Sequence, residues 1–245
     1  MRRKSIKELL NLNFVDYTNQ TYYLGKYDLP YVKCNISEDL DYLALFSEVK
    51  DYHKTDKTGV CFYQYDNVFD GICGLFNAIY YNDVSLLMFY KERFKEVNYF
   101  ITPDYSQVGD APVVECLYRY FKSRVVSLWL TLEVDAVVIP NITYGRRESF
   151  SDMLVGMDDC NVVAFSLKGS MQDVEQKMLL FEAIKYTVDH LKLKSIVVYS
   201  VSTNNDKVYE LFAYAIKKGI KIIIPENSLK SRNGIKKLDG GEVNG

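Results

Sequence analysis

Three strand-like runs of this chain end in a proline that is followed at once by a polar side chain. The three pairs are Pro103-Asp104, Pro140-Asn141 and Pro225-Glu226. A carboxylate in such a position can act as a general base, bind a substrate hydroxyl or ligate a metal ion. The alternative for Asp104 is an Asx-turn after the proline, and Pro-Asn is also ordinary turn chemistry. Asp104 is therefore a candidate catalytic residue and Asn141 a candidate ligand-binding residue.

Polar side chains follow the other strand-like runs as well. They comprise carboxylates, amides, hydroxyls and one lysine, which are typical of a site for a polar small molecule or a phosphate. Ser106, Tyr144 and Ser166 become candidate ligand-binding residues on this ground, whereas Glu226 borders the C-terminal segment and can simply end the last strand. The full set is Asp66; Asp104, Tyr105 and Ser106; Asn141, Thr143 and Tyr144; Ser166 and Lys168; Ser200 and Ser202; Glu226 and Asn227.

Two segments have the composition of an anion site. The run Ser166-Leu-Lys168-Gly-Ser resembles a phosphate-accepting turn between a strand and a capped helix, although it lacks the spacing of a P-loop. Arg146 stands beside a second arginine in a polar loop, and Glu148 begins the helix that follows. Paired arginines at a helix start can hold a phosphate or carboxylate, but they are also common on solvated surfaces.

Several kinds of chemistry find no support in the sequence. Neither His53 nor His190 follows a strand, and no G-x-S-x-G elbow is present, which argues against a Ser-His-Asp triad. The five cysteines are scattered without C-x-x-C spacing, so no metal ligands are assigned and reduced thiols are expected. The cofactor is left open, since no G-x-G-x-x-G motif occurs.

The elements that must position these residues alternate between strand and helix. Successive strand-like runs begin roughly 25 to 40 residues apart, about the length of a strand, a helix and their loops. This rhythm predicts an α/β fold with a mostly parallel sheet of six or seven βα units, as an incomplete (β/α) barrel-like or an open doubly wound sheet. In either arrangement the strand C-terminal ends share one edge. The expected strands include 60–65, 99–102, 136–139, 161–166, 196–199 and 221–224.

Other elements follow from local signals. Ser37 with the acids after it predicts a helix that runs to Tyr52, and Pro112 predicts the first turn of a helix that ends near Glu133. Asp173 has the spacing of a helix cap. We expect a short amphipathic helix over 5–11, one α/β domain over 1–228 and a mobile C-terminal tail over 229–245, whose basic side chains are solvated.

Composition limits the classes of partner that the protein is expected to bind. The net charge of −2 gives no global field for nucleic acid or an anionic membrane, and no window reaches the roughly 18 apolar residues of a membrane span. A cytoplasmic protein without a membrane partner is expected. The 21 tyrosines could supply a ring-rich surface for bases or sugars, or could reflect an AT-rich genome.

The densest pattern lies between residues 99 and 169. It contains Phe100-Ile-Thr-Pro-Asp-Tyr-Ser106, Ala111-Pro112, Arg124, Trp129, Val138-Ile-Pro-Asn141 and Glu148-Ser149. These motifs, with the basic start Arg2-Arg-Lys-Ser-Ile-Lys7, resemble a family known as domain of unknown function 4417, whose members are encoded in bacterial, phage and plasmid genomes. Tyr105 and Tyr144 stand where that family is expected to have Phe and Trp. The resemblance implies a mobile-element setting and adds Arg124 to the candidate ligand-binding positions.

Two functions remain in competition. In the first, the strand-end edge binds a small-molecule or phosphate-containing ligand, and the protein is a hydrolase or transferase. Asp104 is then central, and Lys168 or an arginine faces an anionic group. In the second, the protein is a non-catalytic phage or plasmid accessory protein that binds a host protein or nucleic acid through its aromatic surface. The strand-end residues would then only form turns.

Overall fold

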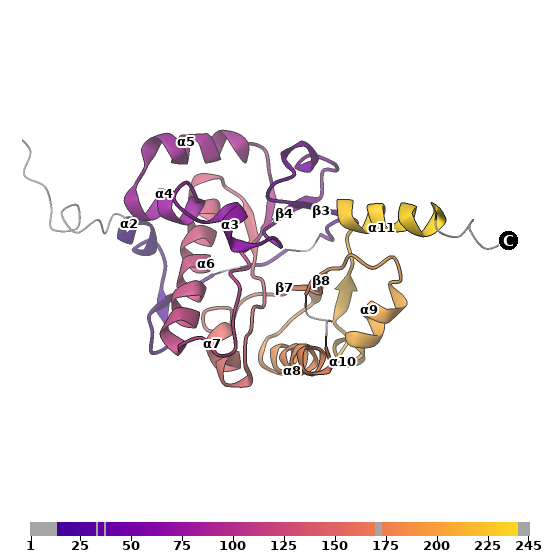
Figure 1. Cartoon of the computed structure of the whole chain (residues 1–245). Helices are drawn as coiled ribbons and strands as arrows, with labels where there is room; N and C mark the ends of the chain where they lie inside the picture. Colours follow the sequence, from indigo (N-terminus) through magenta and orange to yellow (C-terminus); the bar gives the residue numbers. More distant parts are fainter. Residues whose placement is uncertain (1–13, 33, 37, 170–172, 240–245) are drawn as a thin grey trace, which may run out of the picture.

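The computed structural model describes residues 14–32, 34–36, 38–169 and 173–239, which form an α/β fold with two parallel sheets (Figure 1). A short antiparallel hairpin of β1 (Tyr23–Leu24) and β2 (Leu29–Pro30) precedes them. The first sheet has the strand order β3-β4-β5-β6 and the second has the order β7-β8-β9. Their bounds are β3 Tyr42–Leu45, β4 Thr58–Cys61, β5 Tyr99–Ile101, β6 Val137–Ile139, β7 Val162–Ser166, β8 Ser195–Tyr199 and β9 Lys221–Ile223.

Single β-bridges connect the edges of the two sheets. Asn141, just after β6, bridges to Ala164 in β7, and Tyr42 in β3 bridges to Glu226, just after β9. The backbone hydrogen bonds at these bridges are 2.8 to 2.9 Å long. Because the sheets are joined by single bridges within the described ranges, the strands do not form a complete barrel. The predicted α/β class and parallel pairing are confirmed, while the number of six or seven βα units stays a prediction.

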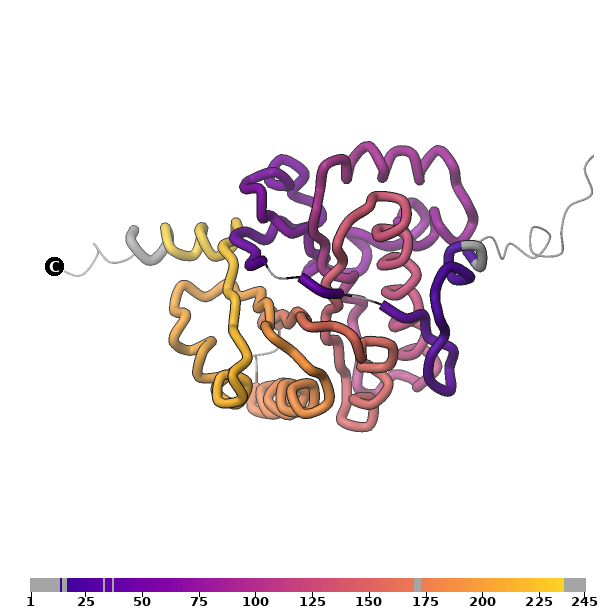
Figure 2. Tube along the Cα trace, turned by 180° about the vertical axis from the view of Figure 1, so that it is seen from behind, coloured from indigo at the N-terminus to yellow at the C-terminus, as the bar shows by residue number. Residues whose placement is uncertain are grey.

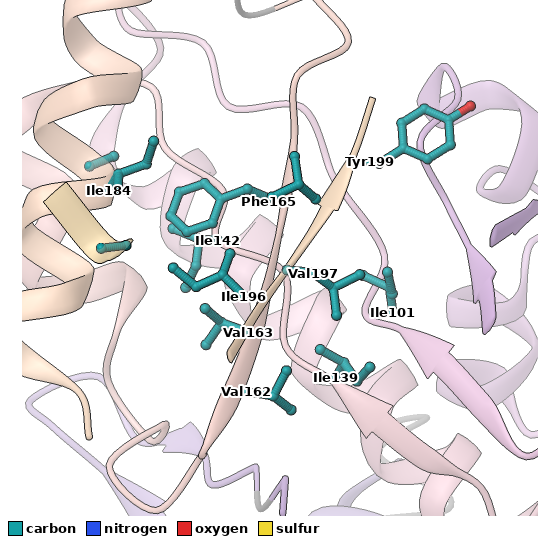
Figure 3. Packing of buried hydrophobic residues seen from close by; sticks show 14 of the residues in the cluster. Ile101, Ile139, Ile142, Val162, Val163, Phe165, Ile184, Ile196, Val197 and Tyr199 are labelled. Carbon is teal, nitrogen blue, oxygen red and sulfur yellow. The ribbon is translucent and has the colours of Figure 1, made fainter. Parts of the chain in front are cut away.

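Residues of the first sheet alternate between two hydrophobic cores. Ala44, Val60 and Phe100 belong to the core between this sheet and the helices outside it, whereas their neighbours Cys61 and Ile101 belong to the core between the two sheets. Alternation of this kind follows from the two-residue period of a strand. Figure 3 shows the inner core, where Ile101, Ile139, Val162 and Val197 lie close together.

Helices cover the outer faces of both sheets. Helices α4 (Leu75–Tyr81), α5 (Val84–Arg93) and α6 (Val113–Glu133) lie on one side of the molecule and pack against the first sheet (Figure 1). Helix α8 (Val174–His190) packs with α10 beside the second sheet. The remaining helical segments are α2 Val15–Thr18, η1 Val49–Asp51, α3 Asp66–Phe69, η2 Arg147–Ser149, α7 Phe150–Met153, α9 Asp206–Leu211, α10 Ala213–Lys217 and α11 Ser228–Asp239.

Local signals account for where the longer helices begin. Pro112 is the N-cap residue of α6, immediately before the first turn in which it was expected, and that helix ends at Glu133. The side chain of Asp173 accepts a hydrogen bond from the backbone N–H of Gln176 at 2.8 Å, which caps α8. Both helices were expected from the sequence, and both expectations are confirmed.

The expected helix that ends at Tyr52 is wrong in its central part, because this segment contains β3. Tyr42–Leu45 pairs in parallel with Thr58–Cys61, and its residues are buried on both faces. A run of apolar residues that is buried on both sides has no helical periodicity, so the acids at positions 38 and 39 misled the assignment.

The segment expected to be a tail begins as helix α11. Its first turns contact the body of the protein, where Ser228 and Arg232 both bond to the carboxylate of Glu48. Lys230 is buried and pairs with Glu226, which contradicts its expected solvation. Figure 2 shows α11 beside the segment that carries β3. The boundary at residue 228 and the mobility of the segment beyond it stay predictions.

Some expectations fall on residues that are not described. The expected helix over 5–11, the cap at position 37 and the serine at position 170 lie outside the described ranges. Among the helices that the structure describes, none combines the length and apolarity needed to cross a membrane.

Replacement of Phe100 by alanine tests the core between the first sheet and the helices outside it. Phe100 is 0% exposed and packs edge-on against Phe94, with 5.0 Å between ring centroids. Phe100→Ala should therefore lower the free energy of unfolding by about 3 to 5 kcal/mol. Urea unfolding can be followed through the fluorescence of the single tryptophan, Trp129, in the same core. The control is Phe89→Ala on the exposed face of α5, which should change stability by less than about 0.5 kcal/mol. Equal losses of unfolding free energy in the two variants would contradict the packing of Phe100 in this core.

Candidate functional site

Asp104 lies at the C-terminal edge of the first sheet, three residues after β5 ends at Ile101. The side chain is half-buried. One carboxylate oxygen, Oδ1, accepts hydrogen bonds from Asn141 Nδ2 at 2.8 Å and from Thr143 Oγ1 at 3.2 Å. Within the described residues, no hydrogen bond reaches the other oxygen, Oδ2. The carboxylate is thus held on one side and available to a ligand on the other.

The amide of Asn141 is fixed in a single orientation. Its Oδ1 accepts a hydrogen bond of 2.8 Å from the hydroxyl of Tyr63, so Nδ2 must be the group that donates to Asp104 and, at 2.9 Å, to Thr143. Burial raises the pKa of Tyr63 well above its usual value, which keeps this hydroxyl neutral and able to donate. The backbone N–H of Asn141 also donates to Thr102 Oγ1 at 2.8 Å.

The pKa of Asp104 is raised from 3.8 to about 6, chiefly because burial disfavours the charged carboxylate. The hydrogen bonds from Thr143 and Asn141 and the charge of Lys168 favour the ionised form and limit the rise, while the charge of Asp66 adds to it. A carboxyl group that titrates near neutral pH can both accept and return a proton during a reaction.

Lys168 lies two residues after β7, at the C-terminal end of the second sheet, and lines the same hollows as Asp104. Its ammonium donates a hydrogen bond of 2.9 Å to the backbone carbonyl of Tyr63, and its backbone N–H donates to Ser166 Oγ at 3.2 Å. In the part of the chain that the structure describes, Lys168 forms no ion pair. Gly169 follows with a φ of +87° and open space around it, a conformation that favours glycine. The lysine therefore remains available to an anionic group.

Two adjoining hollows meet at these residues. The first has a volume of about 270 Å³ and the second of about 330 Å³. Their shared wall consists of Asp104, Ser106, Ser166, Lys168 and Gly169. The first hollow is completed by Tyr63, Gln64 and Tyr65, and the second by Gln107, Asn141, Ile142, Thr143, Tyr144 and Gln176. The expected meeting of Asp104, Ser106, Asn141, Tyr144, Ser166 and Lys168 at one edge is what the structure has.

A second polar network borders the site. Asp66 Oδ1 accepts hydrogen bonds from the backbone N–H and the hydroxyl of Ser106 at 3.2 and 2.9 Å. Its other oxygen, Oδ2, pairs with Arg119 at 2.6 Å, and Arg119 also pairs with Glu115 at 3.0 Å. These contacts fix the loop that carries Ser106 and place a negative charge near Asp104.

Three predicted site residues do not line these two hollows. Arg146 and Glu148 line a separate hollow of about 360 Å³ together with Lys26. Arg124 is 3% exposed and donates through Nη2 to the backbone carbonyls of Met153 at 3.2 Å and of Val155. Burial lowers its pKa to about 10. These contacts hold the end of α7, so their evident effect is structural.

Other strand-end residues lie under α11. Asn227 Nδ2 donates to the carbonyl of Ser200 at 2.9 Å, and Glu226 pairs with Lys230. Within the described ranges, no group of three or more His, Cys, Asp or Glu side chains is placed to hold a metal ion.

The sequence did not single out Tyr63, Gln64 or Tyr65. Tyr63 extends the inward-facing side of β4 by two residues beyond Cys61. Its position could have been found from the two-residue period of the strand, once the inner face was known.

Replacement of Asp104 by asparagine tests the raised pKa. Since the folded state holds the proton more tightly than the unfolded state, the ionised carboxylate destabilises the fold increasingly as pH rises from about 4 to about 7. Asp104→Asn removes this penalty and keeps an oxygen for Asn141 and Thr143. The variant should exceed the wild type in free energy of unfolding by about 1 to 3 kcal/mol at pH 8, with little difference at pH 4.

Urea denaturation at pH 4, 6 and 8 measures this difference. The matched control is Asp110→Asn in an exposed loop, for which no comparable pH dependence is expected. A destabilised Asp104→Asn protein at pH 8 would show that the ionised carboxylate stabilises the fold, contrary to the burial argument.

Comparison with protein families gives a match. A family model described as "Domain of unknown function (DUF4417)" covers residues 21–217, which include both sheets up to β8 and all of the residues around Asp104. No curated protein and no solved structure matches the chain. Because the match covers well over half of the sequence, this chain belongs to the DUF4417 family.

Proposed function

We propose that the edge around Asp104 binds a polar small molecule that contains a phosphate or a sugar, and that the protein is a hydrolase or transferase acting on it. The observation that carries this proposal is the Asp104 carboxylate, which lines both hollows, is held through Oδ1 by Asn141 and Thr143, and accepts no hydrogen bond at Oδ2 from the described residues. A half-buried, oriented carboxyl group with a perturbed pKa is typical of a functional site.

In this proposal, Asp104 is the general base. With a pKa of about 6, it is mostly ionised at neutral pH, and Oδ2 can accept the proton of a bound water or hydroxyl group. Asn141 and Thr143 stay as donors to Oδ1 throughout, so the carboxyl plane keeps its direction. The proton can then return to the leaving group.

Lys168 supplies the charge for an anionic group of the ligand. Its ammonium uses one donor on the carbonyl of Tyr63 and has others to offer. The hydroxyl of Ser106 lies on the same wall of the hollows and can orient the ligand. An ammonium and a carboxyl group on the shared wall of the hollows suit the transfer of a phosphoryl or glycosyl group, or the hydrolysis of the bond that holds it.

A ligand screen by thermal denaturation tests the proposal. Nucleotides, sugars, sugar phosphates and divalent metals are added to the wild type, Asp104→Asn, Lys168→Met and the control Asp110→Asn. At least one phosphate- or sugar-containing compound should raise the melting temperature of the wild type and the control by several degrees. Asp104→Asn and Lys168→Met should lose most of that shift. For a compound that is also turned over, Asp104→Asn should lower kcat by about 10²- to 10⁴-fold. Equal shifts in all four proteins would refute the site.

A second candidate function is binding of a host protein without catalysis. The observation in its favour is the outward face of α5, where Val84, Met88 and Phe89 are exposed. Contiguous apolar side chains on a surface are typical of protein-interaction sites. The mobile-element setting suggested by the sequence suits either function. A purified partner that binds the wild type and a Met88→Ser, Phe89→Ser double variant equally would contradict this role.

A further inference from the structure

Tyr65 is a large aromatic side chain that contributes little to the fold. It is 83% exposed and lines the first hollow, two residues after the buried Tyr63. Among the described residues, its ring contacts no other aromatic ring, and its hydroxyl has no hydrogen-bond partner. It is the residue just before α3, in an extended conformation with φ −61° and ψ 142°. An exposed ring at the wall of a cavity is suited to stacking on a flat ligand.

The two hollows differ in the groups that each adds to the shared wall. Tyr65, Gln64 and Tyr63 give the first hollow an aromatic and amide lining. The second hollow is lined by Ile142 and Tyr144 and by several hydroxyl and amide groups, including those of Asn141 and Thr143. Lys168, without an ion pair among the described residues, stands where the hollows meet. A matching ligand has a flat ring, a polar hydroxyl-bearing part and an anionic group.

We propose that the ligand is a nucleotide whose base stacks on Tyr65 and whose phosphate meets Lys168. The inference rests on the proposed function, because it assigns a substrate class to the same site. The hollows have the volume expected for a ligand of this size. Stacking on an aromatic ring tolerates every base, since each base has a π-face. Tyr65 therefore sets the preference for a base-bearing phosphate over a bare sugar phosphate, without selecting among bases.

Calorimetric titration of the intact protein tests this assignment. The probes are AMP, GMP, CMP and UMP, with ribose 5-phosphate as the ligand without a base and adenosine as the ligand without a phosphate. The variants are Tyr65→Ala, Tyr65→Phe, Lys168→Met and Asp104→Asn, and the control is Tyr209→Ala, an exposed tyrosine on α9. Because Tyr65 is exposed, its replacement should leave folding unchanged.

The nucleotide proposal expects two selective effects. Tyr65→Ala should weaken the binding of nucleotides roughly 5- to 100-fold and leave ribose 5-phosphate unchanged. Lys168→Met should weaken the binding of the nucleotides and of ribose 5-phosphate and leave the binding of adenosine unchanged. Tyr65→Phe and Tyr209→Ala should bind nucleotides as the wild type does.

Two contrary results are distinguishable. The nucleotide assignment is wrong if ribose 5-phosphate binds as tightly as the nucleotides, or if Tyr65→Ala weakens the binding of neither ligand. Binding of the sugar phosphate that depends on Asp104 would then still support the proposed function. If no phosphate- or sugar-containing compound binds in a manner that depends on Asp104, both the substrate class and the proposed function fail.

Discussion

The position of Asn141 is the constraint on which both the architecture and the candidate site depend. Its backbone bridges to Ala164 and so joins the first sheet to the second. Its side chain links the hydroxyl of Tyr63 to the carboxylate of Asp104. One residue thus closes an edge between the sheets and fixes the direction of the acid beside it. The contacts that align the strands therefore also set the geometry of the site.

Much of the fold could be predicted because its signals are local. Prolines after β5 and β6 stop β-branched runs, and the caps at Pro112 and Asp173 mark where α6 and α8 begin. The meeting of Asp104, Asn141 and Lys168 also followed from sequence, since parallel strands bring their C-terminal ends to one edge. Residues placed by strand direction alone were therefore found before the structure.

What could not be predicted depends on partners distant in sequence. The segment that forms β3 has no strand alternation of its own, because burial on both faces comes from pairing with β4 and packing against both cores. Arg124 looked like a binding residue because its type suits an anion, yet its partners are two carbonyls about 30 residues away. The first turn of α11 is held by Glu48, which accepts a hydrogen bond from Ser228 across 180 residues of sequence, and composition does not reveal this contact.

The bridge between Tyr42 and Glu226 has a consequence for biosynthesis. Helix α11 reinforces this edge through Ser228 and Glu48, which are 180 residues apart in sequence. A ribosome therefore releases β3 long before the segment that will cover its outer edge. During that interval, the nascent chain presents an open strand edge, the kind of surface to which other chains can add. The bridge from Tyr42 forms only after translation has reached Glu226, and the arrival of α11 then ends the exposure of this edge.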